Sequence, residues 1–390
     1  MCVWRSLLLL LCTAALMHTV YPLSRGQQWP RRLYKVVNHD NKIGFIDKTG
    51  KLVIGFDRLP KTTIKVGDFH EGRAVIYLKK EERDETRGNM DYTVGYIDET
   101  GKLTIAPRFD EAYDFSEGLA YVEAEGQRAF INRYGKVVIR LGEKTWPSLE
   151  GFASGFHEGL AVVYKQGFFE AGGVHYLEVG FIDRSGKLVF TGWYESAASF
   201  SEGLAAVVVG RGQRARYGFV NKKGEMVIKP RFSPVLRQHD QIQSLSRFSE
   251  GLASVKVGNL YGYIDKQGDF RIPPQFLFAN DFSEGLACVR LNDKTGYIDK
   301  SGRWVIAPWD APYMGGQFKE GLAPVSFSEG GGIGWGYIDR TGKIIIRTGD
   351  HAYEFVDGVA AVYSTRPSNL PQESGWGYIN KAGKYLWRPQ

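Results

Sequence analysis

Cysteine is scarce in this chain, which excludes a fold held together by disulfides. Only three cysteines occur in 390 residues, and Cys2 and Cys12 lie in an amino-terminal segment that we expect to be removed. Cys288 is then alone, so no intramolecular disulfide can form. It occupies a strand position that holds Tyr121 or Val162 in related segments. We therefore predict a small buried hydrophobic residue, not a reactive thiol.

Signatures of catalysis and of metal binding are also absent. The chain has no Gly-x-Ser-x-Gly elbow, no His-Glu-x-x-His, no cysteine pair for zinc, no phosphate-binding Gly-Lys-Ser/Thr and no EF-hand spacing. The loop Ser233–Arg247 contains His239 and Asp240, but adjacent polar side chains on a loop usually face water, and no third partner is evident. We therefore expect no enzymatic activity, no cofactor and no metal, and no catalytic residue can be named.

Long hydrophobic runs are missing beyond the amino terminus. Arg5 precedes an apolar run from Leu7 to Val20, which is followed by small and polar residues up to Gly26. This order is typical of a secretory signal peptide, and the run is shorter than the roughly 20 residues that cross a bilayer. We predict a signal peptide over 1–26, with cleavage after Ala15 as the alternative. The mature chain, 27–390, would be exported to a periplasmic, cell-surface or secreted location without a transmembrane segment.

No block of like charge is present either. Removal of residues 1–26 takes away two arginines, so 48 basic minus 43 acidic residues leaves +5. A mild, scattered excess indicates a solvated surface and gives no reason to expect a nucleic-acid partner. It is compatible with weak attraction to anionic envelope polymers. We expect a monomer.

Repetition is what the sequence has in abundance. A box of the type Phe-Ser-Glu-Gly-Leu-Ala begins at Phe69, Phe115, Phe156, Phe200, Phe248, Phe282, Phe318 and Phe355. A second motif, Gly-Tyr-Ile-Asp followed by a turn and Gly-Lys, begins at Gly44, Gly95, Gly180, Gly218, Gly262, Gly296, Gly336 and Gly377, with a degenerate copy at Ala129. The shortest spacings, 14 plus 20 residues, define a basic unit of 34 residues. Such self-similarity predicts one tandem array of about nine units, each buried by its neighbours.

The units are predicted to be all-β. Short segments rich in β-branched and aromatic residues, separated by Asp-x-x-Gly, indicate hairpins whose glycine is left-handed. We expect three or four short antiparallel strands per unit, forming hairpins or meanders, and little helix. Two geometries fit: an open superhelix, which we favour because nine units exceed the usual 4 to 8 propeller blades, and a closed propeller-like ring.

The repeated side chains have structural interpretations. Successive strand residues point to opposite faces, and both faces are apolar here, so each sheet should lie between its neighbours with the box phenylalanines in between. Recurrent acids suggest the paired carboxylates of a glycosidase, but their repetition in register favours turn and hydrogen-bonding roles. Histidines at the variable box position, His70 and His157, are expected to be structural. The acids are Glu71, Glu117, Glu158, Glu202, Glu250, Glu284, Glu320 and Asp357 in the boxes, and Asp47, Asp98, Asp183, Asp265, Asp299 and Asp339 at the hairpins.

These motifs resemble a known family. Gly334-Trp-Gly-Tyr-Ile-Asp-Arg-Thr-Gly-Lys343 and Gly375-Trp-Gly-Tyr-Ile-Asn-Lys-Ala-Gly-Lys384, together with the boxes, are similar to the WG-repeat proteins of bacteria. The resemblance covers nearly the whole mature chain, although only two copies keep the tryptophan. It implies a β-rich repeat array, often attached to exported or signalling proteins, and it brings no catalytic residues.

Insertions into the basic unit indicate where a ligand would bind. Five of them lengthen the same hairpin tip, at Lys79–Val94, Lys165–Val179, Ser364–Gly375, Gly210–Tyr217 and Ser328–Trp335. They should project from one side of the array, which is typical of a binding surface, although loops also tolerate length changes at little cost. Trp146 and Trp193 lie outside the repeat phase and are candidates for exposed stacking.

The leading hypothesis is an exported, non-enzymatic binding or scaffold protein for a protein or cell-envelope ligand. The alternative is a glycan-binding or carbohydrate-active protein, motivated by the aromatics and carboxylates; a purely structural or storage role also remains open. A cluster of exposed tryptophans and tyrosines on the insertion side would favour binding.

Overall fold

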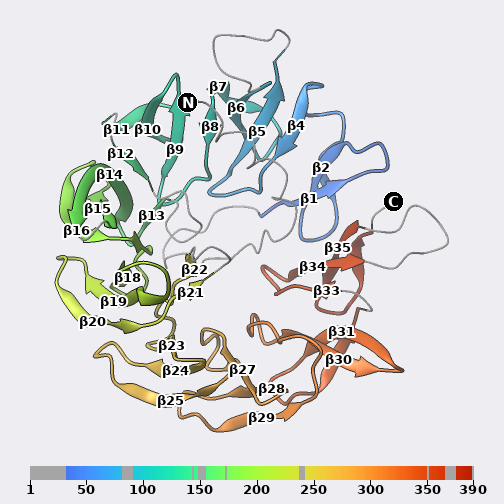
Figure 1. The fold of residues 1–390 in the computed structure, drawn as a ribbon. Coiled ribbons are helices and arrows are strands. Elements are labelled where there is room, and N and C mark those ends of the chain that lie inside the picture. Colours follow the sequence, from blue (N-terminus) through green and yellow to red (C-terminus); the bar gives the residue numbers. More distant parts are fainter. Residues whose placement is uncertain are drawn as a thin grey trace.

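The computed structural model describes residues 32–80, 91–142, 145–147, 155–171, 174–236, 242–348, 351–364 and 375–388. Within these ranges the chain is built from antiparallel strands, and the one helical element is a short 3₁₀ turn, η2 (Gly212–Arg214). The all-β prediction is therefore confirmed. The strands form nine small sheets of three to five strands, one per repeat unit, arranged around a centre (Figure 1).

The sheets follow the chain in order. Unit 1 contains β1 (Tyr34–Val37), β2 (Ile43–Ile46) and β3 (Leu52–Ile54). Unit 2 contains β4 (Thr63–Val66), β5 (Arg73–Lys79), β6 (Tyr92–Asp98) and β7 (Leu103–Phe109). Unit 3 contains β8 (Glu111–Ala112), β9 (Leu119–Ala124), β10 (Gln127–Asn132) and β11 (Val137–Arg140). Unit 4 contains β12 (Thr145–Pro147), β13 (Phe156–His157), β14 (Leu160–Ala171), β15 (Val174–Asp183) and β16 (Leu188–Tyr194). Unit 5 contains β17 (Ser196–Ala197), β18 (Leu204–Val209), β19 (Arg216–Asn221) and β20 (Met226–Phe232).

The remaining units are similar. A two-stranded sheet, β21 (Val235–Leu236) and β22 (Ile242–Ser244), precedes unit 6, which contains β23 (Ala253–Val257), β24 (Leu260–Ile264) and β25 (Phe270–Phe276). Unit 7 contains β26 (Phe278–Ala279), β27 (Ala287–Leu291), β28 (Lys294–Ile298) and β29 (Trp304–Trp309). Unit 8 contains β30 (Ala323–Glu329), β31 (Gly332–Ile338) and β32 (Ile344–Arg347). Unit 9 contains β33 (His351–Ala352), β34 (Val359–Ser364), β35 (Gly375–Asn380) and β36 (Tyr385–Trp387).

The two motifs shape each sheet as the sequence predicts. The box forms a two-residue turn: in unit 3, Ser116 and Leu119 exchange main-chain hydrogen bonds, while Glu117 and Gly118 have φ of 51° and 83°. The strand that follows, here called the box strand, pairs with the Gly-Tyr-Ile-Asp strand. The hairpin aspartates accept main-chain hydrogen bonds two and four residues on, as Asp98 does from Thr100 and Lys102.

Apolar layers join each unit to the next. The box phenylalanines from Phe115 onward are at most 4% exposed, and the box alanines at most 2%. The hairpin glycine of each unit from the second onward lies against an apolar side chain on the last strand of the preceding unit. These pairs are Gly101 on Ile54, Gly135 on Ile105, Gly186 on Ile139, Gly224 on Phe190, Gly268 on Ile228, Gly302 on Ile272, Gly342 on Ile306 and Gly383 on Ile346.

The last unit packs on the first in the same way. Gly50 of unit 1 lies against Leu386 of unit 9, and the rings of Tyr34 and Tyr378 approach to 5.4 Å within a shared apolar cluster. The fold is therefore a closed nine-bladed propeller (Figure 1). The favoured open superhelix is wrong and the alternative ring is right, because unit 9 packs against unit 1. Local motifs do not encode the angle between neighbouring units, which decides whether an array closes.

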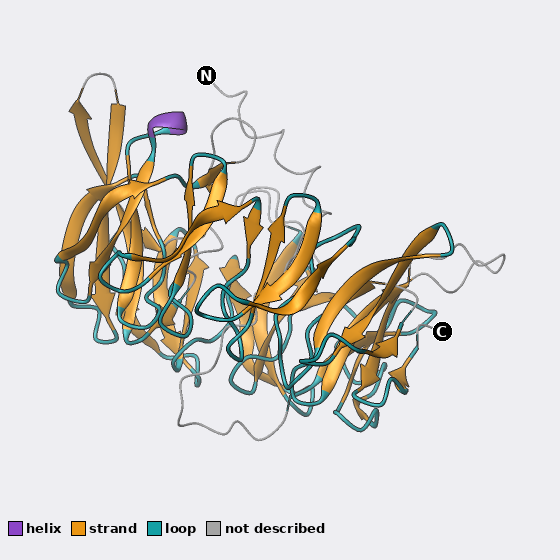
Figure 2. Cartoon of the chain, turned by 90° about the horizontal axis from the view of Figure 1, so that it is seen from below, coloured by secondary structure: helices purple, strands orange, loops and turns teal. Residues whose placement is uncertain are grey.

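Chain direction sorts the connections onto two sides of the ring. The box turn and the Asp-x-x-Gly hairpin lie at one end of the antiparallel strands, and the tip between the box strand and the next strand lies at the other. We call the second the insertion side. The long hairpin β14–β15 and η2 both rise from it in Figure 2, as predicted for the lengthened tips.

Candidate binding face

Aromatic rings gather on the insertion side of units 8 and 9. Tyr313 stacks on Trp335, with ring centroids 5.5 Å apart and planes at 18°. Trp335 also contacts His351 at 4.4 Å. In unit 9, Trp376 lies 5.1 Å from both Tyr353 and Tyr363. We call these six residues the aromatic cluster.

Strand register explains how the cluster forms. His351 pairs with Tyr363, which pairs with Trp376, so these three side chains lie in a row across β33, β34 and β35. Trp335 occupies the same repeat position as Trp376, one unit earlier, next to the tip of the β30–β31 hairpin. Four of the six rings, those of Trp335, His351, Tyr363 and Trp376, are thus held by paired strands.

Much of this aromatic surface faces solvent. The exposed fraction is 49% for Tyr313, 39% for Tyr353 and 50% for Trp376. Burial, followed by the nearby Glu354 carboxylate, raises the pKa of Tyr353, so its hydroxyl stays protonated near neutral pH. An exposed tryptophan braced by two tyrosines offers large contact area at a small cost in conformational entropy, which suits recognition.

Sequence reasoning placed these residues only in part. It named Trp146 and Trp193 as the candidates for exposed stacking and missed Trp335 and Trp376. The available signal was that these two copies alone keep tryptophan, and that both adjoin lengthened tips. Trp193 is 46% exposed, as predicted.

Several other candidates fall outside the described residues. These are the side chain of Trp146, the pair His239 and Asp240, and parts of three tips (81–90, 172–173 and 365–374). The tip Gly210–Tyr217 carries η2.

The acidic box residues lie on the opposite side and link neighbouring units. Glu250 Oε2 accepts a hydrogen bond from the Gly285 N–H of the next unit at 2.9 Å and lies 3.2 Å from Lys300 Nζ. The same carboxylate-to-glycine bond joins Glu71 to Gly118, Glu117 to Gly159, Glu158 to Gly203, Glu202 to Gly251, Glu284 to Gly321 and Glu320 to Gly358. The predicted turn and hydrogen-bonding role is confirmed.

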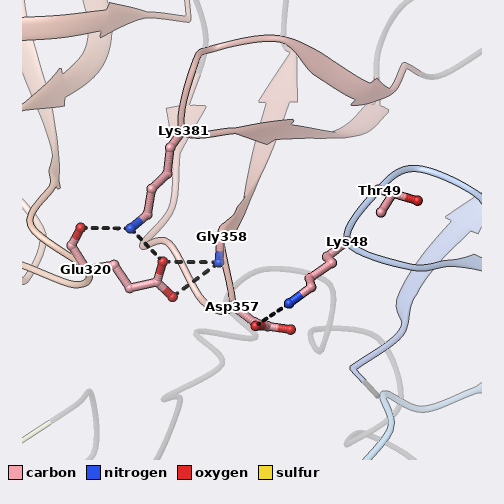
Figure 3. Close-up of a pocket in the computed structure, with 6 residues that line it drawn as sticks. All are labelled: Lys48, Thr49, Glu320, Asp357, Gly358 and Lys381. Carbon is pink, nitrogen blue, oxygen red and sulfur yellow. Dashed lines mark hydrogen bonds and ion pairs between the residues drawn. The ribbon is translucent and has the colours of Figure 1, made fainter. Parts of the chain in front are cut away.

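A shallow polar depression lies where this ladder passes from unit 8 through unit 9 to unit 1 (Figure 3). Glu320 binds Lys381 Nζ at 2.9 Å and the Gly358 N–H at 3.1 Å, and Lys48 Nζ lies 3.4 Å from Asp357. Burial alone would raise the pKa of Glu320, but the hydrogen bonds from Lys381 and Gly358 outweigh it and lower the pKa. These charges neutralise one another, and the depression continues the ladder.

Other features relevant to chemistry are few within the described ranges. They contain no group of three or more His, Cys, Asp or Glu residues that could hold a metal ion. No helix among them is long and apolar enough to cross a membrane. Cys288 is buried as predicted, and burial raises the pKa of its thiol to about 12.

Comparison with known families fits the repeated geometry. The family model described as WG containing repeat matches residues 95–127, 180–211, 217–233, 241–261, 261–294, 296–308 and 335–363. The chain belongs to the WG-repeat family. No curated protein gives a significant match to this WG-repeat protein.

Solved structures resemble this WG-repeat protein in fold. The crystal structure of a eukaryotic initiation factor shares 12% identity, covers 92% of this chain and 95% of its own, and has a TM-score of 0.59. The Dos1 propeller shares 12% identity over 79% of this chain and 92% of its own, with a TM-score of 0.37. PorZ from Porphyromonas gingivalis shares 12% identity over 92% and 52%, with a TM-score of 0.31. At such identities the first of these likenesses shows the fold alone, and the other two add nothing to it.

Proposed function

We propose that this WG-repeat protein is a non-enzymatic, exported scaffold that binds another protein through the insertion side of its ring. The observation that carries the proposal is the aromatic cluster, where Trp376 and Tyr313 are about half exposed. Exposed tryptophan and tyrosine in one patch are typical of interface hot spots. A rigid ring with lengthened hairpins beside that patch supports a binding role.

The aromatic cluster also bears on the glycan alternative, because sugars stack on tryptophan. Carboxylates with two unlike environments would be needed for glycoside hydrolysis, whereas the box acids recur in one environment on the opposite side. We therefore favour a protein partner and make glycan binding an outcome of the test.

The binding proposal is tested by affinity capture from the native host with purified variants. We expect Trp376→Ala combined with Tyr313→Ala to lose the captured partner. The control is Tyr134→Ala, which removes an 86% exposed ring from a hairpin on the opposite side. Retention of every partner by the double variant would contradict the proposal. The proposal would also be contradicted if the protein bound sugars on a glycan array in a Trp376-dependent way while its binding to proteins did not depend on Trp376.

The insertion tips give a second, independent arm. Shortening Lys79–Val94 and Lys165–Val179 to the basic link length should weaken partner capture, because these tips rise from the same side. Intact capture by both shortened proteins would exclude these two tips from the binding surface.

Export is tested separately. The protein recovered from the exported fraction of the native host should begin near residue 27, as the signal-peptide pattern predicts. A chain that keeps Met1 and stays in the cytoplasm would contradict export without affecting the binding proposal.

A further inference from the structure

The last strand of each unit forms the outer edge of its sheet, and the edge in unit 4 differs from its sisters. β16 ends that sheet and lies on the outer margin of the ring (Figure 1). In the sister strands of similar length the fifth residue is proline, whereas β16 has Gly192 there. Proline lacks the N–H that a further strand would need, so it protects an edge from pairing. The prolines are Pro107 in β7, Pro230 in β20, Pro274 in β25 and Pro308 in β29.

The pairing of β16 with its neighbour is also more regular. Sister strands shift register twice against the strand before them, as β7 does on either side of Tyr96. The pairings of β20, β25 and β29 contain the same two shifts. β16 shifts only once, near its start, and its residues from Phe190 to Tyr194 then pair one to one with β15. Bulges twist an edge away from a partner, and this part of β16 has none.

The side chains of β16 are uncharged, and several of them face solvent. Its sequence is Leu-Val-Phe-Thr-Gly-Trp-Tyr. The exposed fraction is 52% for Leu188, 43% for Val189 and 46% for Trp193. Among the last strands of six or seven residues that the structure describes, β16 alone has neither a proline nor a charged residue. It therefore lacks the features that keep the edges of its sisters apart from other strands.

The exposed row on β16 is complementary to itself. Alternate side chains of a strand share a face, so Val189, Thr191 and Trp193 lie together, and all three are exposed. When two copies pair antiparallel about Thr191, Val189 of each copy lies opposite Trp193 of the other, and the two threonines face each other. Aromatic with β-branched side chains and threonine with threonine are favourable cross-strand pairs. No like charges are opposed.

We propose that β16 binds a second copy of this protein, edge to edge and antiparallel, so that the unit 4 sheets of two molecules become continuous. The contact is isologous, with the same residues on both sides, so it closes at a dimer and does not grow into a filament. An open edge would accept many strands, but the match of Val189 with Trp193 about a central Thr191 is what a second copy supplies. The inference goes beyond the proposed function, since the aromatic cluster lies on units 8 and 9.

Sedimentation equilibrium of the purified protein tests the proposal. One strand from each copy makes a small interface, so we expect a weak dimer that forms as the concentration rises from about 1 to 100 μM, with no larger species. Thr191→Lys should weaken the dimer at least about tenfold, because it brings two like charges together at the centre of the contact. Thr191→Glu should do the same. Lys229 occupies the equivalent position in β20, so the fold accommodates a charge there.

Mixing the two variants distinguishes a second copy from any other occupant. An equimolar mixture of Thr191→Lys and Thr191→Glu should dimerise again, because opposite charges then face each other, and this recovery also shows that both variants are folded. The matched control is Ala106→Lys, at the equivalent exposed position of the proline-containing β7, which should dimerise like the unchanged protein.

Three results overturn the proposal: a monomer at every concentration, as the sequence led us to expect, a dimer that neither Thr191 variant weakens, or a mixture that stays monomeric. Partner capture that is lost in Thr191→Lys while the unchanged protein is monomeric would also overturn it, because the occupant would then be a strand of another protein.

Discussion

At the scale of single residues, the glycine before the Tyr-Ile-Asp segment is required because another main chain passes too close to leave room for a Cβ. In unit 6 the third strand passes so close that a Cβ on Gly262 would lie 2.6 Å from Ile272 O and 2.7 Å from Pro274 N. Unit 4 is different, because a Cβ on Gly180 would first meet the flexible Leu188 side chain at 2.9 Å. The same motif residue is thus under different constraints in two units.

Gly262→Ala should therefore destabilise the protein more than Gly180→Ala. Main-chain atoms cannot move without distorting β25, so we expect a loss of about 1 to 3 kcal/mol for Gly262→Ala, the usual range for overpacking. Urea denaturation followed by tryptophan fluorescence would measure both. Equal shifts of the midpoint would show that the crossing adjusts freely.

The hairpin aspartates are also defined at the residue scale. Asp299 Oδ1 accepts hydrogen bonds from the Ser301 hydroxyl at 2.5 Å, the Ser301 N–H at 2.8 Å and the Arg303 N–H at 3.1 Å. The Ser301 hydroxyl is the main cause that lowers the pKa of Asp299 to about 2, against an opposing effect of burial. Asn132 accepts equivalent main-chain bonds in unit 3, so the turn itself does not require a charge.

Asp299→Asn should keep the turn and remove one source of acid sensitivity. The unfolded carboxyl takes up its proton near pH 4, above the folded pKa of about 2, so its contribution to stability is complete above pH 4 and is lost as the pH falls towards 2. The stability of the native protein relative to Asp299→Asn should therefore decline over that interval. Thermal denaturation at pH 7, 4 and 2.5 would test this, and a constant difference would contradict it.

At the scale of the element, the box turn combines strain with a contact across units. Glu250 has φ of 54°, a left-handed conformation that costs roughly 1 to 2 kcal/mol in a residue with a Cβ. Glycine would avoid this cost. Glutamate is used because its side chain reaches the Gly285 N–H and Lys300 of the next unit. The turn thus fastens one sheet to its neighbour.

Glu250→Ala should destabilise the protein by about 1 to 3 kcal/mol, since it leaves the Gly285 N–H without its charged acceptor and keeps the strain. Glu250→Gln retains an acceptor oxygen and should cost less. Chemical denaturation of both variants provides the measurement. If the two variants lose stability equally, the cross-unit hydrogen bond is not what the side chain contributes.

At the scale of the whole molecule, no strand is exchanged between the first and last units within the part of the chain that the structure describes. Among the described residues, unit 1 contains β1 to β3 and unit 9 contains β33 to β36, and the two units contact each other through side chains. The contacts include the Tyr34 hydroxyl to Val356 O at 2.8 Å and the rings of Phe56 and Trp387 at 5.8 Å. The interface between units 9 and 1 should therefore be the one most sensitive to a single substitution.

Gly50→Ala tests closure directly. A Cβ there would lie 2.8 Å from Leu386 O, and the residue has φ of 85°. Gly126→Ala is the matched control, because Gly126 has φ of 73° and no atom within 4 Å of the added Cβ. We expect both to share the left-handed strain of about 1 to 2 kcal/mol.

Only Gly50→Ala should also speed hydrogen exchange in β1–β3 and β34–β36. Unchanged exchange in these strands would show that closure does not depend on this contact.

Much of the fold could be predicted from sequence because it depends on local rules. The box predicts its turn, Asp-x-x-Gly predicts its hairpin, and alternation of apolar residues such as Tyr96 and Ile97 predicts a sheet covered on both faces. The candidate site was less predictable. Trp335 and Trp376 share a repeat position with the buried Tyr217, so their exposure depends on what the next unit places against them.

The sequence by itself determined the repeat, the all-β units and the side on which the long tips project, because each of these follows from turn chemistry and chain direction within one unit. The tertiary structure alone decided that nine units form a ring and that the Trp376 side chain is half exposed. Both depend on the angle between neighbouring units and on the meeting of the first unit with the last, and residues so far apart in sequence carry no local signal of either.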